Sequence, residues 1–285
     1  MALAPLATCR RERPQPAGED PGLWRELEFV PSVEHPTAQH AAVLAEPGAP
    51  LLVALHGRGE AVRGLVRGAR GWRNDYALGR AHAALSRGSL VAEDFGGLVR
   101  PERLAVLNAA LRAEPYRGLC VACPYTPALP DPSEAGARPF ASFLLDQLIA
   151  RVRRELGPKA GREATGIDGV SMGGRLALLV GLSHPEVFGA VGALQPAISV
   201  ADAPWLAKLA AAASARAPGA LRLVTSDADP LRPACEKLSE RLRAEGVEHQ
   251  LLVTPGPHDY VWNRGPGAIE MLFWHDRVLR GRQPT

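Results

Sequence analysis

From about residue 51 to the end of the chain, short apolar runs alternate with stretches of helical periodicity. Two of these runs, residues 51–55 and 119–123, are apolar at every position, which is typical of strands buried on both faces. Buried strands separated by amphipathic helices form mostly parallel sheets with helices on both faces. The chain is therefore predicted to be an α/β protein with a sheet of about eight strands.

The same pattern gives the expected order of elements. Residues 1–22 are rich in Pro, Arg and Ala without any period, so we expect a loose N-terminal leader, followed by a single α/β domain at 23–285. The interval 58–118 is the longest between core strands and the expected place for segments that shape a substrate site. Strands are expected at 27–30, 40–45, 51–55, 119–123, 165–170, 190–194, 221–225 and 249–253, a Pro-rich loop at 124–139, and helices at 101–114, 140–156, 173–182, 204–215, 231–244 and 268–279.

Composition excludes several classes of function. The net charge is only +3, and the arginines, 30 of the 33 basic residues, are spread among acidic residues, so no basic face for nucleic acid is expected. No run approaches the roughly 20 apolar residues of a membrane span. The apolar start is too short for a signal peptide. We therefore expect a soluble, cytoplasmic protein that binds neither nucleic acid nor membrane.

The four cysteines are too few and too scattered for a disulfide framework. Cys120 and Cys123 lie three positions apart in an expected strand, so their side chains point to opposite faces and cannot readily bind one metal ion. We interpret both as small buried apolar residues. No other cluster resembles a metal site or a dinucleotide loop, so neither a metal nor an organic cofactor is expected.

The sequence Gly169-Val-Ser171-Met-Gly173 lies where an expected buried strand becomes a helix. In such a sharp turn, glycines two positions before and after the serine let the two backbones pass. The turn raises the Ser171 hydroxyl above the carboxyl ends of the strands, and the Met172 amide at the helix start faces any oxyanion that forms. The alternative is a glycine-rich turn that contains serine by chance.

A nucleophilic serine needs a base, and a histidine base needs an orienting acid. His258 follows the last expected strand and is the preferred base, whereas His56 follows an early strand. Asp227 and Asp229 follow the strand at 221–225, between the serine and the histidine. Asp229 is preferred because the following proline restricts its backbone, although it could instead cap the next helix. Asp227 could instead have a structural role and accept hydrogen bonds from loop amides.

The order Ser, Asp, His along the chain is that of α/β-hydrolases. Between about Leu51 and Trp274 the chain resembles the putative-esterase branch of that fold, which includes esterase D-type, feruloyl and enterochelin esterases and mycolyltransferases. The resemblance is carried by Leu55-His-Gly57, Gly169-Val-Ser-Met-Gly-Gly174, His184-Pro185 with Phe188, Asp227-Ala-Asp-Pro-Leu231 and Gly256-Pro-His-Asp-Tyr260.

The resemblance implies that Ser171 is the nucleophile, His258 the base and Asp229 the acid. It also implies an oxyanion hole made by the backbone amides of Met172 and Arg58. Pro257 departs from the family, where glycine is common, and it would stiffen the histidine loop.

The expected function is that of a serine carboxylic-ester hydrolase acting on a small-molecule ester through an acyl-enzyme. Acyl transfer and thioester cleavage use the same intermediate and remain open, as does a catalytically silent hydrolase fold used for binding. A peptidase is a further alternative. The acyl group, the alcohol and the oligomeric state do not follow from the sequence.

Overall fold

The computed structural model describes residues 23–282, and the expected leader at 1–22 lies outside them. The strands are β1 (Trp24–Phe29), β2 (Gln39–Leu44), β3 (Leu51–Leu55), β4 (Cys120–Pro124), β5 (Thr165–Gly169), β6 (Ala190–Leu194), β7 (Ala220–Ala228) and β8 (Gln250–Pro257). The helices are α1 (Arg58–Ala61), α2 (Leu65–Ala69), α3 (Leu78–Ser86), α4 (Pro101–Ala113), α5 (Glu134–Ser142), α6 (Ala150–Leu156), α7 (Met172–Ser183), α8 (Ala203–Arg216), α9 (Arg232–Ala244), α10 (Tyr260–Trp262) and α11 (Ala268–Val278).

The eight strands form one sheet in the order β1-β2-β4-β3-β5-β6-β7-β8. All neighbours from β4 to β8 pair in parallel, whereas β2 pairs antiparallel with both β1 and β4. The antiparallel strands at one edge follow from the short β1–β2 connection, since a parallel pair needs a crossover of a dozen or more residues. The predicted α/β fold and its mostly parallel sheet are confirmed.

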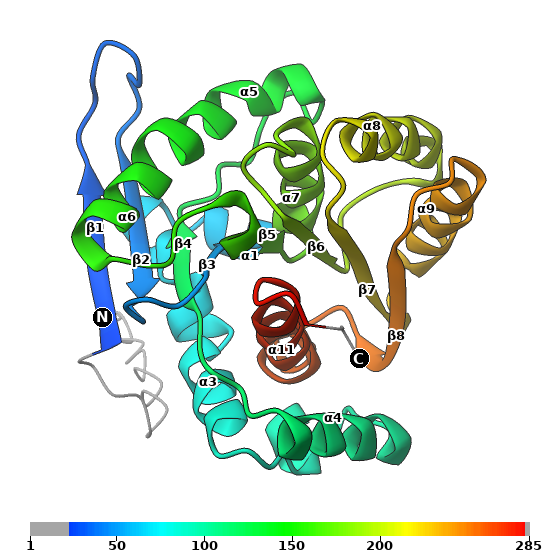
Figure 1. Ribbon diagram of the computed structural model, residues 1–285. Coiled ribbons are helices and arrows are strands. Elements are labelled where there is room, and N and C mark those ends of the chain that lie inside the picture. The colour runs from blue at the N-terminus through cyan, green and yellow to red at the C-terminus, as the bar shows by residue number, and fades with distance from the viewer. Residues whose placement is uncertain (1–22, 283–285) are drawn as a thin grey trace, which may run out of the picture.

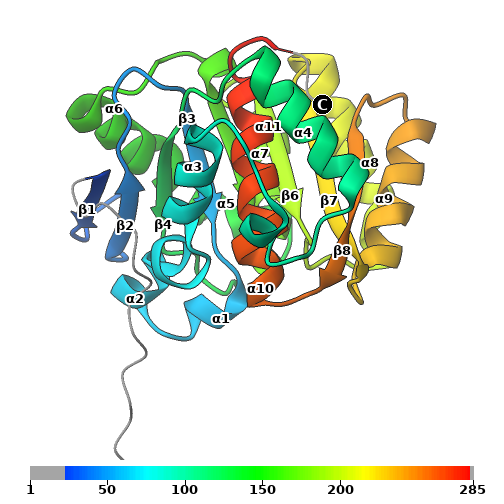
Figure 2. The same ribbon diagram turned by 90° about the horizontal axis from the view of Figure 1, so that it is seen from below.

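Each face of the sheet carries its own apolar core. Helices α5 to α9 cover one face, and α3, α4 and α11 cover the other (Figures 1 and 2). Residues alternate between the two cores along each strand, as in β3, where Leu51 and Val53 face α5 to α9 while Leu52 and Ala54 face α11. Cys120 and Cys123 likewise lie in opposite cores, both buried, as the strand spacing predicts.

The two largest differences from the predicted element boundaries are at α5 and β8. The helix expected from residue 140 begins at Glu134, because Ser133 accepts a hydrogen bond from the Gly136 amide and Ala137, Phe140 and Ala141 bury one face. This packing outweighs the backbone hydrogen bond lost at Pro139, which lies inside α5. The last strand continues beyond residue 253 to Pro257, since β8 pairs with the extended end of β7.

Helix α11 carries charged groups into the core between itself and the sheet. Glu270, 1% exposed, accepts hydrogen bonds from Arg103 and Arg222, and His275 Nε2 lies 3.0 Å from Asp168 Oδ2. A carboxylate this deeply buried is tolerated only when it is paired and hydrogen-bonded. These contacts tie α11 to α4, β5 and β7.

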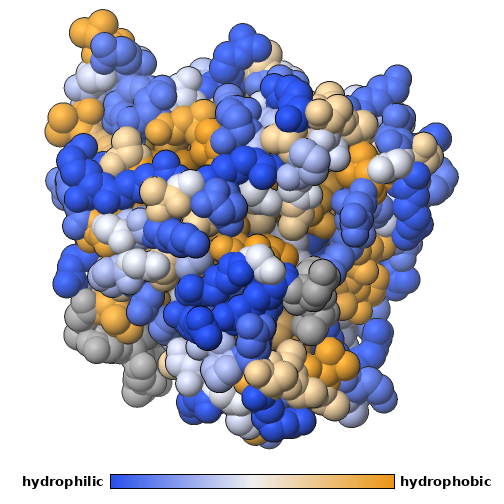
Figure 3. Space-filling view, in the orientation of Figure 1, coloured by the Kyte–Doolittle hydropathy of each residue, from blue (hydrophilic) through white to orange (hydrophobic). Residues whose placement is uncertain are grey.

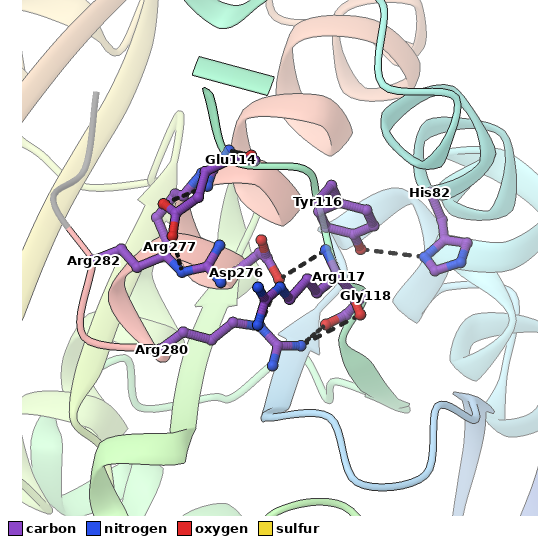
Figure 4. Close-up of polar contacts among 9 residues, drawn as sticks. All are labelled: His82, Glu114, Tyr116, Arg117, Gly118, Asp276, Arg277, Arg280 and Arg282. Carbon is purple, nitrogen blue, oxygen red and sulfur yellow. Dashed lines mark hydrogen bonds and ion pairs between the residues drawn. The ribbon is translucent and has the colours of Figure 1, made fainter. Parts of the chain in front are cut away.

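A second polar cluster holds the end of α11 against the segment before β4 (Figure 4). Arg277 donates to Glu114 Oε2 at 2.9 Å, Arg282 pairs with the other oxygen of that carboxylate, and Arg280 joins Asp276 to the Gly118 carbonyl. The cluster lies at the amino edge of the sheet, away from the strand ends that precede Ser171, Asp229 and His258.

The face in Figure 3 carries hydrophilic side chains with apolar ones scattered between them. Within residues 23–282, no helix is long and apolar enough to cross a membrane.

Candidate active site

The residues chosen from the sequence all follow parallel strands at their carboxyl ends. His56 follows β3, Ser171 follows β5, Asp229 follows β7 and His258 follows β8. Because β3 pairs with β5 and β7 pairs with β8, these loops share one edge of the sheet. Open α/β sheets bind their ligands at this edge.

Ser171 has a strained backbone. Its φ of 57° and ψ of −115° lie outside the regions that non-glycine residues ordinarily adopt, at a typical cost of about 1–3 kcal/mol. The conformation is held because the Ser171 amide donates to Leu194 O at 2.9 Å and its carbonyl accepts from Ala197 N at 2.8 Å. The side chain is half-buried at the start of α7, as expected for the serine of a strand–turn–helix elbow.

The glycines around Ser171 are required by close backbone approach. A Cβ on Gly173 would lie 2.4 Å from Leu55 O, and a Cβ on Gly169 would lie 2.5 Å from Gly173 C. Both distances are far below van der Waals contact and involve backbone atoms, which cannot move aside. The steric reason inferred from the sequence therefore holds in the structure.

His56 is fixed in the wall of the site. It is fully buried, its Nε2 accepts from the Thr126 amide at 2.8 Å, and its Nδ1 lies 2.9 Å from Gly57 O. Burial lowers the pKa of His56 to about 4, so the ring is neutral at neutral pH. With both ring nitrogens engaged, His56 joins the end of β3 to the end of β4.

The turn after His56 approaches Ser171. A Cβ on Gly57 would lie 3.7 Å from the Ser171 Cβ. Arg58 and Met172 are the first residues of α1 and α7, and the first amides of a helix have no acceptor within their own helix. Both amides are therefore available to a ligand oxygen.

Asp229 and His258 meet. The His258 Nδ1 lies 3.1 Å from Asp229 Oδ1, and Asp229 also accepts from the Leu231 amide at 2.9 Å and from Thr225 Oγ1 at 2.8 Å. Burial raises the pKa of Asp229, but the hydrogen bonds from His258, Leu231 and Thr225 outweigh it and lower that pKa below its ordinary value. An ionised Asp229 keeps the His258 proton on Nδ1 and leaves Nε2 as the basic nitrogen.

Asp227 has different partners. Its Oδ1 accepts from the Gly256 amide at 3.0 Å and its Oδ2 lies 3.3 Å from Arg100 Nη2. It therefore ties β8 to β7 and does not contact His258. Within residues 23–282, no hydrogen bond joins the Ser171 hydroxyl to His258; such contacts are often long in ligand-free hydrolases.

The fold is shared with solved structures of an esterase and of S-formylglutathione hydrolases. A ferulic acid esterase matches with a TM-score of 0.62 at 16% identity, over 90% of this chain and 98% of that chain. An S-formylglutathione hydrolase from Staphylococcus aureus matches with a TM-score of 0.61 at 14% identity, over 89% of this chain and 98% of that chain. One from Agrobacterium tumefaciens gives a TM-score of 0.58 at 16% identity, over 90% of this chain and 95% of that chain. At these identities the likeness shows the fold alone, and no curated protein matches in sequence.

The family described as putative esterase matches residues 123–264. This range contains Ser171, Asp229 and His258, whereas the turn at His56 lies before it. The chain is similar to this family over those residues. The resemblance predicted from the sequence is thereby confirmed, and the match supports the prediction of a carboxylic-ester hydrolase.

Among the residues of this candidate site that sequence reasoning missed is the one that follows β6. Gln195 follows β6 with a φ of 42°, and its Nε2 donates to Ser226 Oγ at 2.7 Å and to Pro257 O at 3.2 Å. It therefore connects the strand beside the serine elbow to the peptide before His258. An isolated glutamine after an apolar strand gave no signal in the sequence.

A cavity of about 390 Å³ lies beside this edge of the sheet. It is lined by α3, the turn at 92–96 and the segment at 261–265 that follows His258. Most of its lining comes from the interval 58–118, which the sequence marked as the expected place for substrate-shaping segments. Arg80, Arg87 and Arg264 bring positive charge to it, and Glu93 and Asp94 negative charge.

Proposed function

We propose that this protein is a serine carboxylic-ester hydrolase that forms an acyl-enzyme on Ser171. The observation that carries the proposal is the strained Ser171 elbow at the sheet edge where His258 and Asp229 form a hydrogen-bonded pair. The family match over residues 123–264 supports the same chemistry.

In the proposed first half-reaction, the Ser171 Oγ attacks the ester carbonyl carbon while its proton passes to His258 Nε2. The carbonyl oxygen becomes an oxyanion and receives hydrogen bonds from the Met172 and Arg58 amides. The tetrahedral intermediate collapses as His258 gives its proton to the departing alcohol oxygen. The acyl group remains esterified to Ser171.

In the second half-reaction, His258 Nε2 takes a proton from water as the water oxygen attacks the acyl carbon. The C–Oγ bond then breaks, the proton returns to Ser171, and the carboxylic acid leaves. Asp229 stays ionised throughout, since its hydrogen bonds lower its pKa, and it stabilises the imidazolium that forms.

The same acyl-enzyme can pass its acyl group to an alcohol, and a thioester can replace the ester in the first step. A panel of p-nitrophenyl esters and thioesters of increasing acyl length, with and without added alcohols, separates these reactions. We expect Ser171→Ala to lose at least about 10⁴-fold in kcat on the preferred ester while keeping its Tm. Undiminished hydrolysis by this variant would refute the proposal.

A further inference from the structure

A buried carboxylate lies two residues beyond the proposed oxyanion amide of Arg58. Glu60, on α1, is 1% exposed and accepts hydrogen bonds from two phenols: Tyr76 on one oxygen and Tyr260, at 2.6 Å, on the other. Arg63 Nη2 lies 4.0 Å from the same carboxylate. Two phenol donors to a buried carboxylate, both from other elements, indicate that Glu60 joins parts of the site.

The Tyr76 phenol connects Glu60 to the oxyanion turn. Its oxygen accepts a hydrogen bond from the Gly57 amide at 3.1 Å while its proton goes to Glu60. Burial and the charge of Glu60 raise the pKa of Tyr76 well above its ordinary value, so the phenol stays protonated and can make both contacts. Gly57 is the residue that faces the Ser171 Cβ, and its peptide carbon is bonded to the Arg58 nitrogen.

The Tyr260 phenol connects Glu60 to the histidine loop. Tyr260 is two residues after His258, at the start of α10, where the Asp259 side chain accepts from the Trp262 amide at 2.9 Å. The Tyr260 oxygen also accepts a hydrogen bond from Arg63 Nη2 at 3.1 Å. Figure 2 shows α10 beside α1. Glu60 therefore bridges the turn that would bind the oxyanion and the loop that carries the proposed base.

Close packing restricts the positions of Glu60 and Tyr260. A Cβ on Gly59 would lie 2.7 Å from the Tyr260 oxygen, and a Cβ on Gly71 would lie 2.5 Å from Glu60 Cγ. The rings of Tyr76 and Tyr260 also lie against each other, with centroids 5.8 Å apart. A side chain at Gly59 or at Gly71 would therefore displace Tyr260 or Glu60 from these positions.

We propose that Glu60, Tyr76 and Tyr260 are positioning residues. They hold the Arg58 amide and the His258 ring in the positions that stabilise the oxyanionic transition state. This inference rests on the proposed function. It concerns residues outside the Ser-His-Asp set, and the three act through the Gly57 amide and the histidine loop without touching the substrate.

The test compares Tyr76→Phe and Tyr260→Phe with Tyr125→Phe as a matched control. Tyr125 also donates a phenol hydrogen bond to α1, at Ala61 O and 3.1 Å, but contacts neither Gly57 nor Glu60. Each variant is assayed for kcat and KM on a p-nitrophenyl ester, for Ki of a trifluoromethyl ketone, and for Tm. The ketone adds to the serine and places an anionic oxygen in the oxyanion hole, so its Ki reports transition-state binding.

We expect Tyr76→Phe to lower kcat by about 10- to 100-fold with KM within about twofold, and to raise the ketone Ki by a similar factor. Tyr260→Phe should show the same pattern at about 3- to 10-fold, and Tyr125→Phe should stay within about twofold of wild type. If both test variants match Tyr125→Phe in kcat and Ki, the inference is wrong, whatever their Tm values. Hydrolysis that survives in Ser171→Ala would instead contradict the proposed function, which separates the two failures.

Discussion

At the scale of single residues, one carboxylate makes both of the contacts that the sequence presented as alternatives. Asp229 Oδ1 accepts from both the Leu231 amide, at the start of α9, and His258 Nδ1. Its other oxygen is held by Thr225. The contacts that stabilise the helix start therefore also fix the carboxylate for the histidine, and the side chain is 0% exposed.

This geometry predicts different outcomes for the two neighbouring aspartates. Asp229→Asn should lower kcat by about 10⁴-fold, because the amide favours the wrong histidine tautomer. Asp227→Asn should change kcat by less than about tenfold, since Asp227 contacts the Gly256 amide and Arg100. Steady-state kinetics with Tm for both variants decides between them. If Asp227→Asn loses kcat while Asp229→Asn only has a lower Tm, Asp229 stabilises the start of α9 and does not orient His258.

At the scale of elements, the β5–α7 turn depends on backbone contact with the end of β3. Gly173 packs against the carbonyls of Leu55 and His56, so α7 starts directly against the oxyanion turn. The two segments that would bind the oxyanion, at Met172 and at Arg58, therefore share one rigid junction. A change in the junction displaces both.

Gly173→Ala should therefore impair both activity and stability. Its Cβ would overlap Leu55 O, and overpacking of this kind costs about 1–3 kcal/mol. We expect a lower urea midpoint and a loss of kcat of at least about tenfold. Ser183→Ala, at the other end of α7, is the control and should keep wild-type kcat. Full activity in Gly173→Ala would show that the junction tolerates a shift.

At the scale of the whole molecule, the two cores enclose several imidazoles whose pKa values are lowered by burial. Burial lowers the pKa of His56 to about 4, and it also lowers the pKa values of His82 and His275. The unfolded chain takes up protons near pH 6.5, whereas the folded chain takes one up at His56 only near pH 4. Protonation between these values favours the unfolded chain, so stability falls as pH falls.

Chemical denaturation at pH 7 and pH 4.5 measures this effect. Protonation of His56 alone should lower the free energy of unfolding by about 2 kcal/mol between pH 7 and pH 4.5. His56→Gln keeps a side chain able to accept from the Thr126 amide but does not titrate, so its loss of stability between the two pH values should be smaller than that of wild type by about that amount. Equal losses in both proteins would mean that His56 does not titrate in this range.

The sequence predicted what depends on local patterns. Continuous apolar runs predicted the parallel strands, and the small residues around Ser171 predicted the strand–turn–helix elbow. The pairing of Asp229 with His258 followed from their places after successive strands. The Pro-rich composition up to Pro139 predicts a loop where α5 begins, and only tertiary packing shows that the helix accommodates this proline.

The supporting contacts could not be predicted in this way. Glu60 and Tyr260 are 200 residues apart in the chain, and Gln195 and Pro257 are 62 apart. Glu60, Tyr260 and Gln195 are single polar side chains, and nothing in the neighbouring sequence indicates which distant group each one contacts. Such long-range pairs follow only from how β3, β6 and β8 are placed in the sheet.

The central claim is an acyl-enzyme on Ser171, and intact-protein mass spectrometry tests it most directly. Wild-type protein mixed with excess p-nitrophenyl ester and quenched in acid during turnover should gain the mass of one acyl group. Peptide mapping should place that group on the peptide that contains Ser171. His258→Ala should acylate at least about 10³-fold more slowly, and Ser171→Ala should gain no mass. An adduct on any other residue, or an unchanged adduct in Ser171→Ala, would contradict the account.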